Sequence, residues 1–333
     1  MKITPAPFAR RQALVAAAAA AALLYLPAAS AQTYPTRAVR IVVPFAAGGG
    51  TDVMARTVGE QLSKRLGQPV IVENKVGGSG MLAVDGIAKS AADGYSIVLG
   101  ITGPLLTNQF LYEKMPYNIE QDLVFVAQAA DAPLVLVVAN SVPVKTAPEL
   151  LKYMAANKGK LSYGSFGIGS YPHLAGYYMS KTTDADMVHV AYKGEALMLQ
   201  DVVGGRVQMA FATALAAKAL AEGGKMKMLG VTGSKRMATL PHLPTIAEQG
   251  LDDEVYKVVG FMGFAMNRKT PQPIVERLSK ELQAVLVLPP VVSRFSDMGF
   301  TAHTGSQKDF ENRYKTDAPV WKKLVLDSGA KVE

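Results

Sequence analysis

The residues in this sequence best suited to binding chemistry form a glycine loop, Gly48-Gly49-Gly50-Thr51-Asp52. The loop follows a β-branched run, Val39 to Val43, and precedes a helical pattern from Val53 to Leu66. A strand, a loop and a helix in this order direct several free backbone N–H groups, and the positive end of the helix dipole, at one point. The loop can therefore bind an anion without a charged side chain. Its glycines also suit a plain tight turn, because glycine accepts a positive φ wherever it occurs.

The side chains of this first loop have more than one possible role. Thr51 or Asp52 is the expected N-cap of the helix. Asp52 suits capping better than ligand contact, because its charge would repel a bound anion. Phe45, just before the loop, is a candidate either for the apolar wall of a site or for the core.

Two further glycine loops occur in the second half of the chain. Phe166 to Ser170 follows a predicted strand and precedes a predicted helix from Pro172 to Lys181. Tyr192-Lys193-Gly194 follows the predicted strand Met187 to Ala191 and precedes a predicted helix from Glu195 to Val203. Loops at the carboxyl ends of strands in open α/β sheets face the crevice where ligands bind. These loops are therefore expected to form a second wall opposite the first loop.

The composition disfavours most enzyme classes. The chain has no cysteine, which excludes disulfides, thiolate nucleophiles and cysteine metal sites. The serines of Gly78-Ser79-Gly80 and Gly164-Ser165-Phe166 do not complete a G-x-S-x-G motif, and the first loop lacks the lysine of a phosphate loop. We expect no catalytic residue, no metal and no cofactor. The histidines, too scattered to suggest a metal site, are His173, His189, His242 and His303.

The N-terminus reads as a cleaved export signal. Lys2, Arg10 and Arg11 precede an apolar run that is too short to anchor a helix in a bilayer, and small residues follow at Ala29-Ser30-Ala31. We predict a signal peptide over residues 1–31, cleavage after Ala31, and a periplasmic location. The arginine pair leaves both the general secretory route and a twin-arginine route open.

Charge argues against nucleic acid as a partner. Without the signal, 32 basic and 27 acidic residues remain, a net charge of +5. These charges form no long run of one sign, so they favour a small anionic ligand through a diffuse field rather than nucleic acid.

Predicted strands alternate with predicted helices over most of the chain, which indicates an α/β fold with mainly parallel sheets. Two apolar runs separated by a proline, Leu123 to Ala129 and Leu134 to Ala139, suit a crossing from one domain to another. The stretch Val255 to Met266 suits the return crossing. The C-terminal helices are expected to pack on the first sheet. The predicted lobes are residues 32–132 with 257–333, and residues 133–256.

Taken in order, these motifs resemble the solute-binding proteins of tripartite tricarboxylate transporters, the Bug family. The resemblance covers nearly the whole mature chain. In the first lobe it rests on the segment Pro44 to Arg56, on Val72 to Lys75 with Gly77 to Gly80, and on Ala92 to Tyr95. In the second it rests on Tyr163 to Ser170 with His173-Leu174, on His189 to Gly194, on Gly204 to Val207, and on Leu240 to Glu248.

The resemblance implies a type II periplasmic binding protein fold, with two α/β lobes joined by two crossover strands and a ligand cleft between them. It implies a monomer that binds a small organic carboxylate, without catalysis, and delivers it to the membrane subunits of a tripartite tricarboxylate transporter. A sensor subunit that presents the same ligand to a receptor kinase is the alternative, followed by a secreted carboxylate-handling enzyme. The implied ligand-binding residues are Phe45, Ala47, Gly48, Gly49, Gly50, Thr51, Asp52, Thr102, Ser165, Gly169, Ser170, Tyr192, Lys193, Gly194, Ala212 and Thr213.

Several of these roles have a structural alternative. Ser170 is equally suited to be only the N-cap of the next helix, and Lys193 to a solvated position at the rim. The chain also departs from the family at Phe211-Ala212-Thr213, where the family commonly has Phe-Asp-Asn. Without that acid the cleft lacks a partner for a ligand ammonium group, which favours a carboxylate without an amino group.

Overall fold

The structure is a computed structural model that describes residues 34–330. The predicted signal peptide, residues 1–31 with cleavage after Ala31, lies outside the described residues. All elements below belong to the compact unit that starts at Arg37. Among residues 34–330, no helix combines the length and the apolar composition that a membrane span requires.

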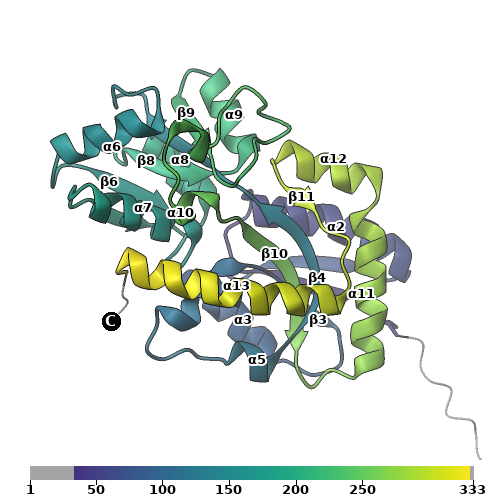
Figure 1. The fold of residues 1–333 in the computed structure, drawn as a ribbon. Coiled ribbons are helices and arrows are strands. Elements are labelled where there is room, and N and C mark those ends of the chain that lie inside the picture. Colours follow the sequence, from purple (N-terminus) through teal and green to yellow (C-terminus); the bar gives the residue numbers. More distant parts are fainter. Residues whose placement is uncertain (1–33, 331–333) are drawn as a thin grey trace, which may run out of the picture. The chain divides into compact units, whose positions relative to one another are not determined.

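The first sheet, as far as the chain is described, has six strands in the order β11-β4-β10-β3-β1-β2 (Figure 1). β1 pairs in parallel with β2 and with β3, because a helix crosses over after β1 and another after β2. Val39, Ile41 and Val43 are fully buried. The strands are β1 (Val39–Val43), β2 (Val70–Asn74), β3 (Ser96–Ile101), β4 (Leu123–Ala132), β10 (Gly260–Asn267) and β11 (Thr301–Ala302).

The second sheet has five strands within the described residues, in the order β7-β6-β8-β5-β9. β6 pairs in parallel with β7 and β8, whereas β5 pairs antiparallel with β8 and β9. The strands are β5 (Val135–Ala139), β6 (Ser162–Ser165), β7 (Val188–Ala191), β8 (Met209–Ala212) and β9 (Met226–Val231).

Helices flank both sheets. Those of the first lobe are α2 (Gly50–Leu66), α3 (Met81–Ala88), α4 (Thr102–Leu105), α5 (Ile119–Asp122), α11 (Gln272–Leu286) and α12 (Pro289–Asp297), with short 3₁₀ turns at Gly78–Gly80 and Thr107–Phe110. Those of the second are α6 (Ala147–Ala156), α7 (Tyr171–Thr182), α8 (Glu195–Val203), α9 (Ala214–Glu222) and α10 (Glu254–Lys257), with a 3₁₀ turn at Ala247–Gln249. The last helix is α13 (Gln307–Ser328).

Local sequence signals explain several of these boundaries. α2 ends at Gly67, whose φ of 66° and N–H bond to the Ser63 carbonyl form a glycine C-cap. α6 begins after Thr146, whose hydroxyl accepts the Glu149 N–H. α13 begins with a capping box between Ser306 and Asp309.

The expectation of mainly parallel sheets needs correction, because both sheets are mixed. The strand–loop–helix units are parallel as expected, but β10 pairs antiparallel with β3 and β4, and β5 pairs antiparallel with both of its neighbours. The strands next to the crossings cause the difference. β4 leaves the first sheet and β10 returns to it beside β4, so the two strands must run in opposite directions.

The two crossings lie next to each other. Gly260 at the start of β10 is opposite Ala132 at the end of β4, and β5 of the second sheet begins only at Val135. The chain therefore passes between the sheets through two adjacent segments, as expected from the two apolar stretches.

The last helix departs from the expectation that the C-terminal helices pack on the first sheet. α11 and the start of α13 do contact β4, but the second half of α13 contacts α7 of the second lobe (Figure 1). The Trp321 ring lies edge-on to Tyr171 at 6.3 Å between centroids, and Lys181 Nζ donates to the Asp327 carbonyl at 2.8 Å. A helix of 22 residues is about 33 Å long at 1.5 Å per residue, which is enough to reach past one lobe.

Candidate functional site

A cavity lies where the two lobes meet, with a volume of about 70 Å³. One water needs about 10–15 Å³ on the same measure, so the cavity has room for a small molecule. It is lined by Phe45, Ala46, Gly49, Gly50, Thr51, Asp52, Ile101, Thr102, Gly103, Ala132, Leu134, Phe166, Tyr171, Glu195, Thr213, Gly260, Phe261 and Met262.

Several helix N-termini meet at this cavity. Gly50, Tyr171 and Glu195 are the first residues of α2, α7 and α8, and Thr213 is the N-cap of α9. Each of these ends carries a partial positive charge. The starts of α2 and α7 also have free N–H groups, although Pro172 of α7 has none, whereas the Thr213 N–H is bonded to Glu195 and the Ala214 N–H to the Met298 carbonyl. The cavity is thus suited to a small anion, although Asp52 and Glu195 are the ionisable side chains of the described wall other than Tyr171.

The first glycine loop folds back on itself through Asp52. The N-cap of α2 is Gly49, so the expectation of Thr51 or Asp52 as N-cap is wrong. Asp52 instead accepts a hydrogen bond from Gly48 N–H at 3.0 Å and an ion pair from Arg56 at 2.9 Å. Burial raises the pKa of this carboxyl, but hydrogen bonds from Arg56, Gly48 and Asn74 outweigh burial, and the net pKa is lowered. Asp52 thus serves to fix the loop, as its charge suggested.

Most of the cavity wall is apolar. Phe45 is 8% exposed, lines the cavity and meets Phe166 of the other lobe edge-on at 6.2 Å between ring centroids. Tyr171 also faces the cavity, and its hydroxyl is satisfied by the Val255 carbonyl at 2.8 Å. Phe45 is therefore both largely buried and a wall of the site.

Glu195 is the functional candidate that the sequence pattern did not reveal. Its Oε1 accepts the Thr213 N–H at 2.5 Å, and its Oε2 accepts the Thr213 hydroxyl at 3.1 Å. Burial raises the pKa of Glu195, against hydrogen bonds from Thr213 and from the Gly50 N–H. The sequence argument that the cleft lacks an acid, drawn from Ala212, is therefore corrected, since an acid enters the wall from α8. Its only sequence signal is an acidic residue directly after the loop glycine Gly194.

The serine hydroxyls of the second-lobe loop form their hydrogen bonds within the second lobe. Ser165 is fully buried, and its Oγ lies 3.1 Å from the Gly167 carbonyl and 2.8 Å from Nε2 of His189. Ser170 stands at the N-cap position of α7 but donates to the Gly167 carbonyl at 2.6 Å. Neither hydroxyl lines the cavity, and nor does Gly169.

Two neutral histidines form hydrogen bonds to residues of this loop. Gly169 N–H donates to Nδ1 of His173 at 3.2 Å, and the rings of His173 and His189 are 4.3 Å apart. Burial lowers the pKa of His173 to about 3, with a contribution from His189, and burial lowers the pKa of His189 to about 4. Both rings are therefore uncharged at neutral pH.

The remaining predicted residues include some that line the cavity and some that lie outside its lining. The Tyr192 hydroxyl donates to Asp201 at 2.7 Å, and Lys193 is exposed. Thr102 lines the cavity, but its hydroxyl accepts the Phe261 N–H at 2.8 Å. The predicted residues that line the cavity are Phe45, Gly49, Gly50, Thr51, Asp52, Thr102 and Thr213; those outside it are Ala47, Gly48, Ser165, Gly169, Ser170, Tyr192, Lys193, Gly194 and Ala212.

Direct hydrogen bonds join the loops of the two lobes around the cavity. Ala46 N–H donates to the Lys193 carbonyl at 3.1 Å, and Ile168 N–H donates to the Ser79 hydroxyl at 2.9 Å. Behind them, Ala214 N–H at the start of α9 donates to the Met298 carbonyl at 3.1 Å. Backbone contacts thus hold the two lobes together beside the cavity, which remains partly open to solvent.

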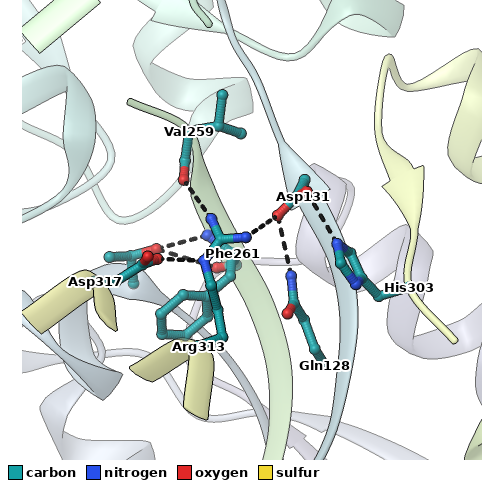
Figure 2. A network of polar contacts seen from close by, with 8 residues as sticks. Gln128, Asp131, Val259, Phe261, His303, Arg313 and Asp317 are labelled. Carbon is teal, nitrogen blue, oxygen red and sulfur yellow. Dashed lines mark hydrogen bonds and ion pairs between the residues drawn. The ribbon is translucent and has the colours of Figure 1, made fainter. Parts of the chain in front are cut away.

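A charged network lies on the other side of the crossing strands (Figure 2). Asp131, next to Ala132 of the cavity wall, pairs with His303 at 3.0 Å and with Arg313 at 3.4 Å. Arg313 on α13 also pairs with Asp317 at 2.6 Å. Since neighbouring residues of a strand point to opposite faces, β4 separates this network from the cavity.

Within residues 34–330, no three histidine, aspartate or glutamate side chains gather closely enough to hold a metal ion.

Comparisons with known proteins agree with this geometry. The sequence profile of the tripartite tricarboxylate transporter family receptors, TctC, matches residues 54–329. Among solved structures, the R. palustris protein Rpa4515 with adipate is 34% identical, with a TM-score of 0.85, over 90% of this chain and 100% of that one. The periplasmic binding protein BugD is 32% identical, with a TM-score of 0.84, over 90% and 100%. MatC from Rhodopseudomonas palustris with bound malate is 28% identical, with a TM-score of 0.82, over 88% and 100%.

Proposed function

This chain belongs to the tripartite tricarboxylate transporter receptor family, and on that premise we propose that it captures a small organic carboxylate in the interlobe cavity. It then delivers the ligand to the membrane subunits of a transporter of this class. Family membership makes the chain a solute-binding receptor with a two-lobe α/β fold, rather than an enzyme. The ligand and the membrane partner are the proposed parts.

The observation that carries the proposal is the meeting of helix N-termini at a cavity between the lobes. α2 comes from one lobe, and α7, α8 and α9 come from the other. A carboxylate placed there receives backbone N–H groups from both sides, and neither lobe alone provides the full set. Relatives whose structures contain adipate and malate support a carboxylate as the ligand.

Binding through amides also accounts for the charge of the loops. Asp52, the charged side chain of the first loop, is neutralised by Arg56, and Lys193 of the second lobe is exposed. The proposed contacts are therefore the N–H groups of Gly49 and Thr51, which have no backbone acceptor among the described residues, and the Thr51 hydroxyl, while the Gly50 N–H is bonded to Glu195.

The wider setting follows from the same proposal. We place the mature chain in the periplasm, where homologues such as BugD act, with the signal cleaved after Ala31. The lobe boundaries that we propose remain residues 32–132 with 257–333, and residues 133–256, although α10 ends at Lys257, one residue beyond the second boundary.

A ligand screen tests the proposal directly. Thermal denaturation of the mature chain is measured with mono-, di- and tricarboxylates, amino acids and aromatic acids. A true ligand at 100 times its Kd stabilises the folded state by about 2.7 kcal/mol. A screen in which no acid stabilises the chain, or a hit that the protein chemically converts, overturns the proposal.

Delivery is tested in cells. Loss of the chain must abolish uptake of the acid found in the screen, and a plasmid copy must restore it. Unchanged uptake overturns delivery and leaves the binding step standing.

A further inference from the structure

We infer that Glu195 sets the ligand class of this cavity by supplying one carboxylate itself, so that the ligand carries a single carboxylate on an apolar body. The inference rests on the proposed function, since it concerns which acids the same cavity accepts. It concerns a residue outside the glycine loops, at the start of α8.

The contacts of Glu195 are those expected of a bound carboxylate. Thr213 at the N-terminus of α9 donates its N–H at 2.5 Å and its hydroxyl at 3.1 Å. The Gly50 N–H, at the N-terminus of α2, is a third donor. The side chain thus bridges a helix of the first lobe and a helix of the second. It fills a position that would otherwise suit an anionic group of the ligand.

Glu195 is also buried, which makes its charge effective. The residue is 8% exposed and lines the cavity. Two carboxylates in this cavity repel each other, because Glu195 is buried against a largely apolar wall and is poorly screened by water. A ligand with a carboxylate at each end would have to place one of them near Glu195, or else leave it in the apolar part of the cavity.

The rest of the wall defines the body of the ligand. Beside the loop glycines, the cavity presents large apolar side chains from both lobes and from the crossing strands. These side chains are Phe45, Ile101, Leu134, Phe166, Tyr171, Phe261 and Met262. A ligand body with few polar groups leaves no unsatisfied hydrogen-bonding group against this wall.

The carboxylate of the ligand has a separate place. The Thr51 side chain and the N–H groups of Thr51 and Asp52 remain free among the described residues, as does the Tyr171 N–H at the start of α7, whereas the Gly50 N–H is bonded to Glu195. The end of the ligand next to Glu195 is then apolar or donates a hydrogen bond, because the carboxylate oxygens of Glu195 still have acceptor capacity.

The charged and titratable groups around Glu195 do not cancel its charge. Asp52 shares the cavity wall but is paired with Arg56, and Lys193 on the preceding loop is exposed. Tyr171 is the remaining titratable group of the wall, and burial raises its pKa. Burial likewise raises the pKa of Glu195. A proton on Glu195 therefore relieves the repulsion, and dicarboxylates gain affinity as the pH falls.

The test compares acids of one length that differ in one carboxylate. The probes are hexanoate, adipate and the monoamide of adipate, and the shorter set butyrate, succinate and the monoamide of succinate. Calorimetric titration at pH 8 gives the Kd of each. One of the two sets will bind the wild-type chain more tightly than the other. Within that set, we expect the tighter-binding of the two monocarboxylates, the simple acid or the monoamide, to bind at least tenfold more tightly than the dicarboxylate.

The variant Glu195→Gln keeps the shape and removes the charge. It should strengthen dicarboxylate binding at least tenfold and change monocarboxylate binding less than threefold. Glu222→Gln is the matched control, because Glu222 is the last residue of α9 and its side chain is 67% exposed. The control should leave every Kd within twofold of wild type. Thermal denaturation establishes that both variants fold.

If Glu195→Gln does not fold, the pH dependence of ligand binding to the wild-type chain tests the inference instead. The ratio of dicarboxylate to monocarboxylate Kd should fall as the pH is lowered from 8 over the range in which the ligand carboxyls stay ionised, because burial raises the pKa of Glu195. A wild-type chain that binds the dicarboxylate as tightly as the monocarboxylate at pH 8 overturns the role of Glu195 while the carboxylate-binding function stands. A ratio that is unchanged in both the variant and the pH series overturns it as well. If no acid binds at all, the proposed function fails first.

Discussion

The loop from Phe45 to Asp52 and the loop from Ser165 to Ser170 both join a buried strand to a helix, and both are rich in glycine. In the first, Gly49, Gly50 and Thr51 line the interlobe cavity. In the second, Phe166 reaches the cavity, while the serine hydroxyls bond inside the loop and to His189.

The two loops differ in whether their polar groups have a hydrogen-bond partner nearby in the chain. Backbone N–H groups at the start of a helix have no partner inside that helix, so they remain available to a ligand. A serine hydroxyl turns easily to a nearby carbonyl, as Ser165 and Ser170 do toward Gly167. The first loop therefore presents donors, and the second loop is a rigid support that holds an aromatic wall in place.

Lowering the pH should destabilise the protein through the two histidines that contact the loop from Ser165 to Ser170. This is the largest effect that we predict. The folded-state pKa values of His173 and His189 are about 3 and about 4, below the ordinary value of 6.5. The unfolded chain then binds more protons than the folded chain between pH 6.5 and pH 4, so stability falls as the pH falls through this window. One pKa unit is worth about 1.4 kcal/mol, so the loss should reach several kcal/mol.

Urea unfolding from pH 7.5 to pH 4 measures this loss. The variant His173→Phe, which keeps a ring at this position, should show a shallower pH dependence than wild type. Equal slopes for the two proteins would assign the acid sensitivity to other groups.

The first loop should respond in binding rather than in stability. Gly49 has a φ of −82°, and a Cβ placed there meets nothing closer than 3.9 Å. Gly49→Leu should therefore fold, with a melting temperature within a few degrees of wild type, while its side chain fills the cavity. We expect at least a 100-fold loss of affinity, about 2.7 kcal/mol, by calorimetric titration with the screened acid.

Ala196→Leu is the control for Gly49→Leu. It adds bulk at an exposed position of α8, near the same loops. An unfolded Gly49→Leu protein would show instead that the glycines serve only the turn.

Much of the fold could be predicted from local patterns, because each unit of strand, glycine loop and helix consists of consecutive residues. The caps at Gly67 and Thr146 and the crossings near Pro133 were recognised in this way. The antiparallel neighbours of β10 and β5 were not, because pairing between distant strands leaves no periodic signal. The same holds for α13, whose contact with α7 depends on its length in space.

The residues of the cavity wall also differ in whether the sequence alone could predict them. Gly49 was predicted because a glycine loop can be read from the sequence, and Thr213 because the family resemblance implied it. Leu134, Phe261 and Met262 come from the crossing strands and look like ordinary core residues. Glu195 follows a loop glycine and looks like a helix start; only its bonds to Thr213 place it in the cavity.

Removing a hydroxyl from the support should cost stability and leave affinity nearly unchanged. Ser165→Ala takes away the acceptor of the Gly167 N–H and the partner of His189 in a fully buried position. An unsatisfied buried group costs about 1–3 kcal/mol, and we expect a loss of about 1.5 kcal/mol in urea unfolding. A change of tenfold or more in ligand Kd would instead make the hydroxyl a ligand contact.

The smallest effect is expected at Lys193, the cation of the implicated loops. Its backbone carbonyl accepts the Ala46 N–H, but its side chain is exposed. A screened surface charge contributes about 0–1 kcal/mol, so Lys193→Ala should weaken binding fivefold at most, as should the exposed control Lys225→Ala. The two variants should also lose affinity equally as salt is added, because both act only through the diffuse field. A 100-fold loss confined to Lys193→Ala would move the binding energy from the backbone donors of the first loop to a side chain of the second lobe.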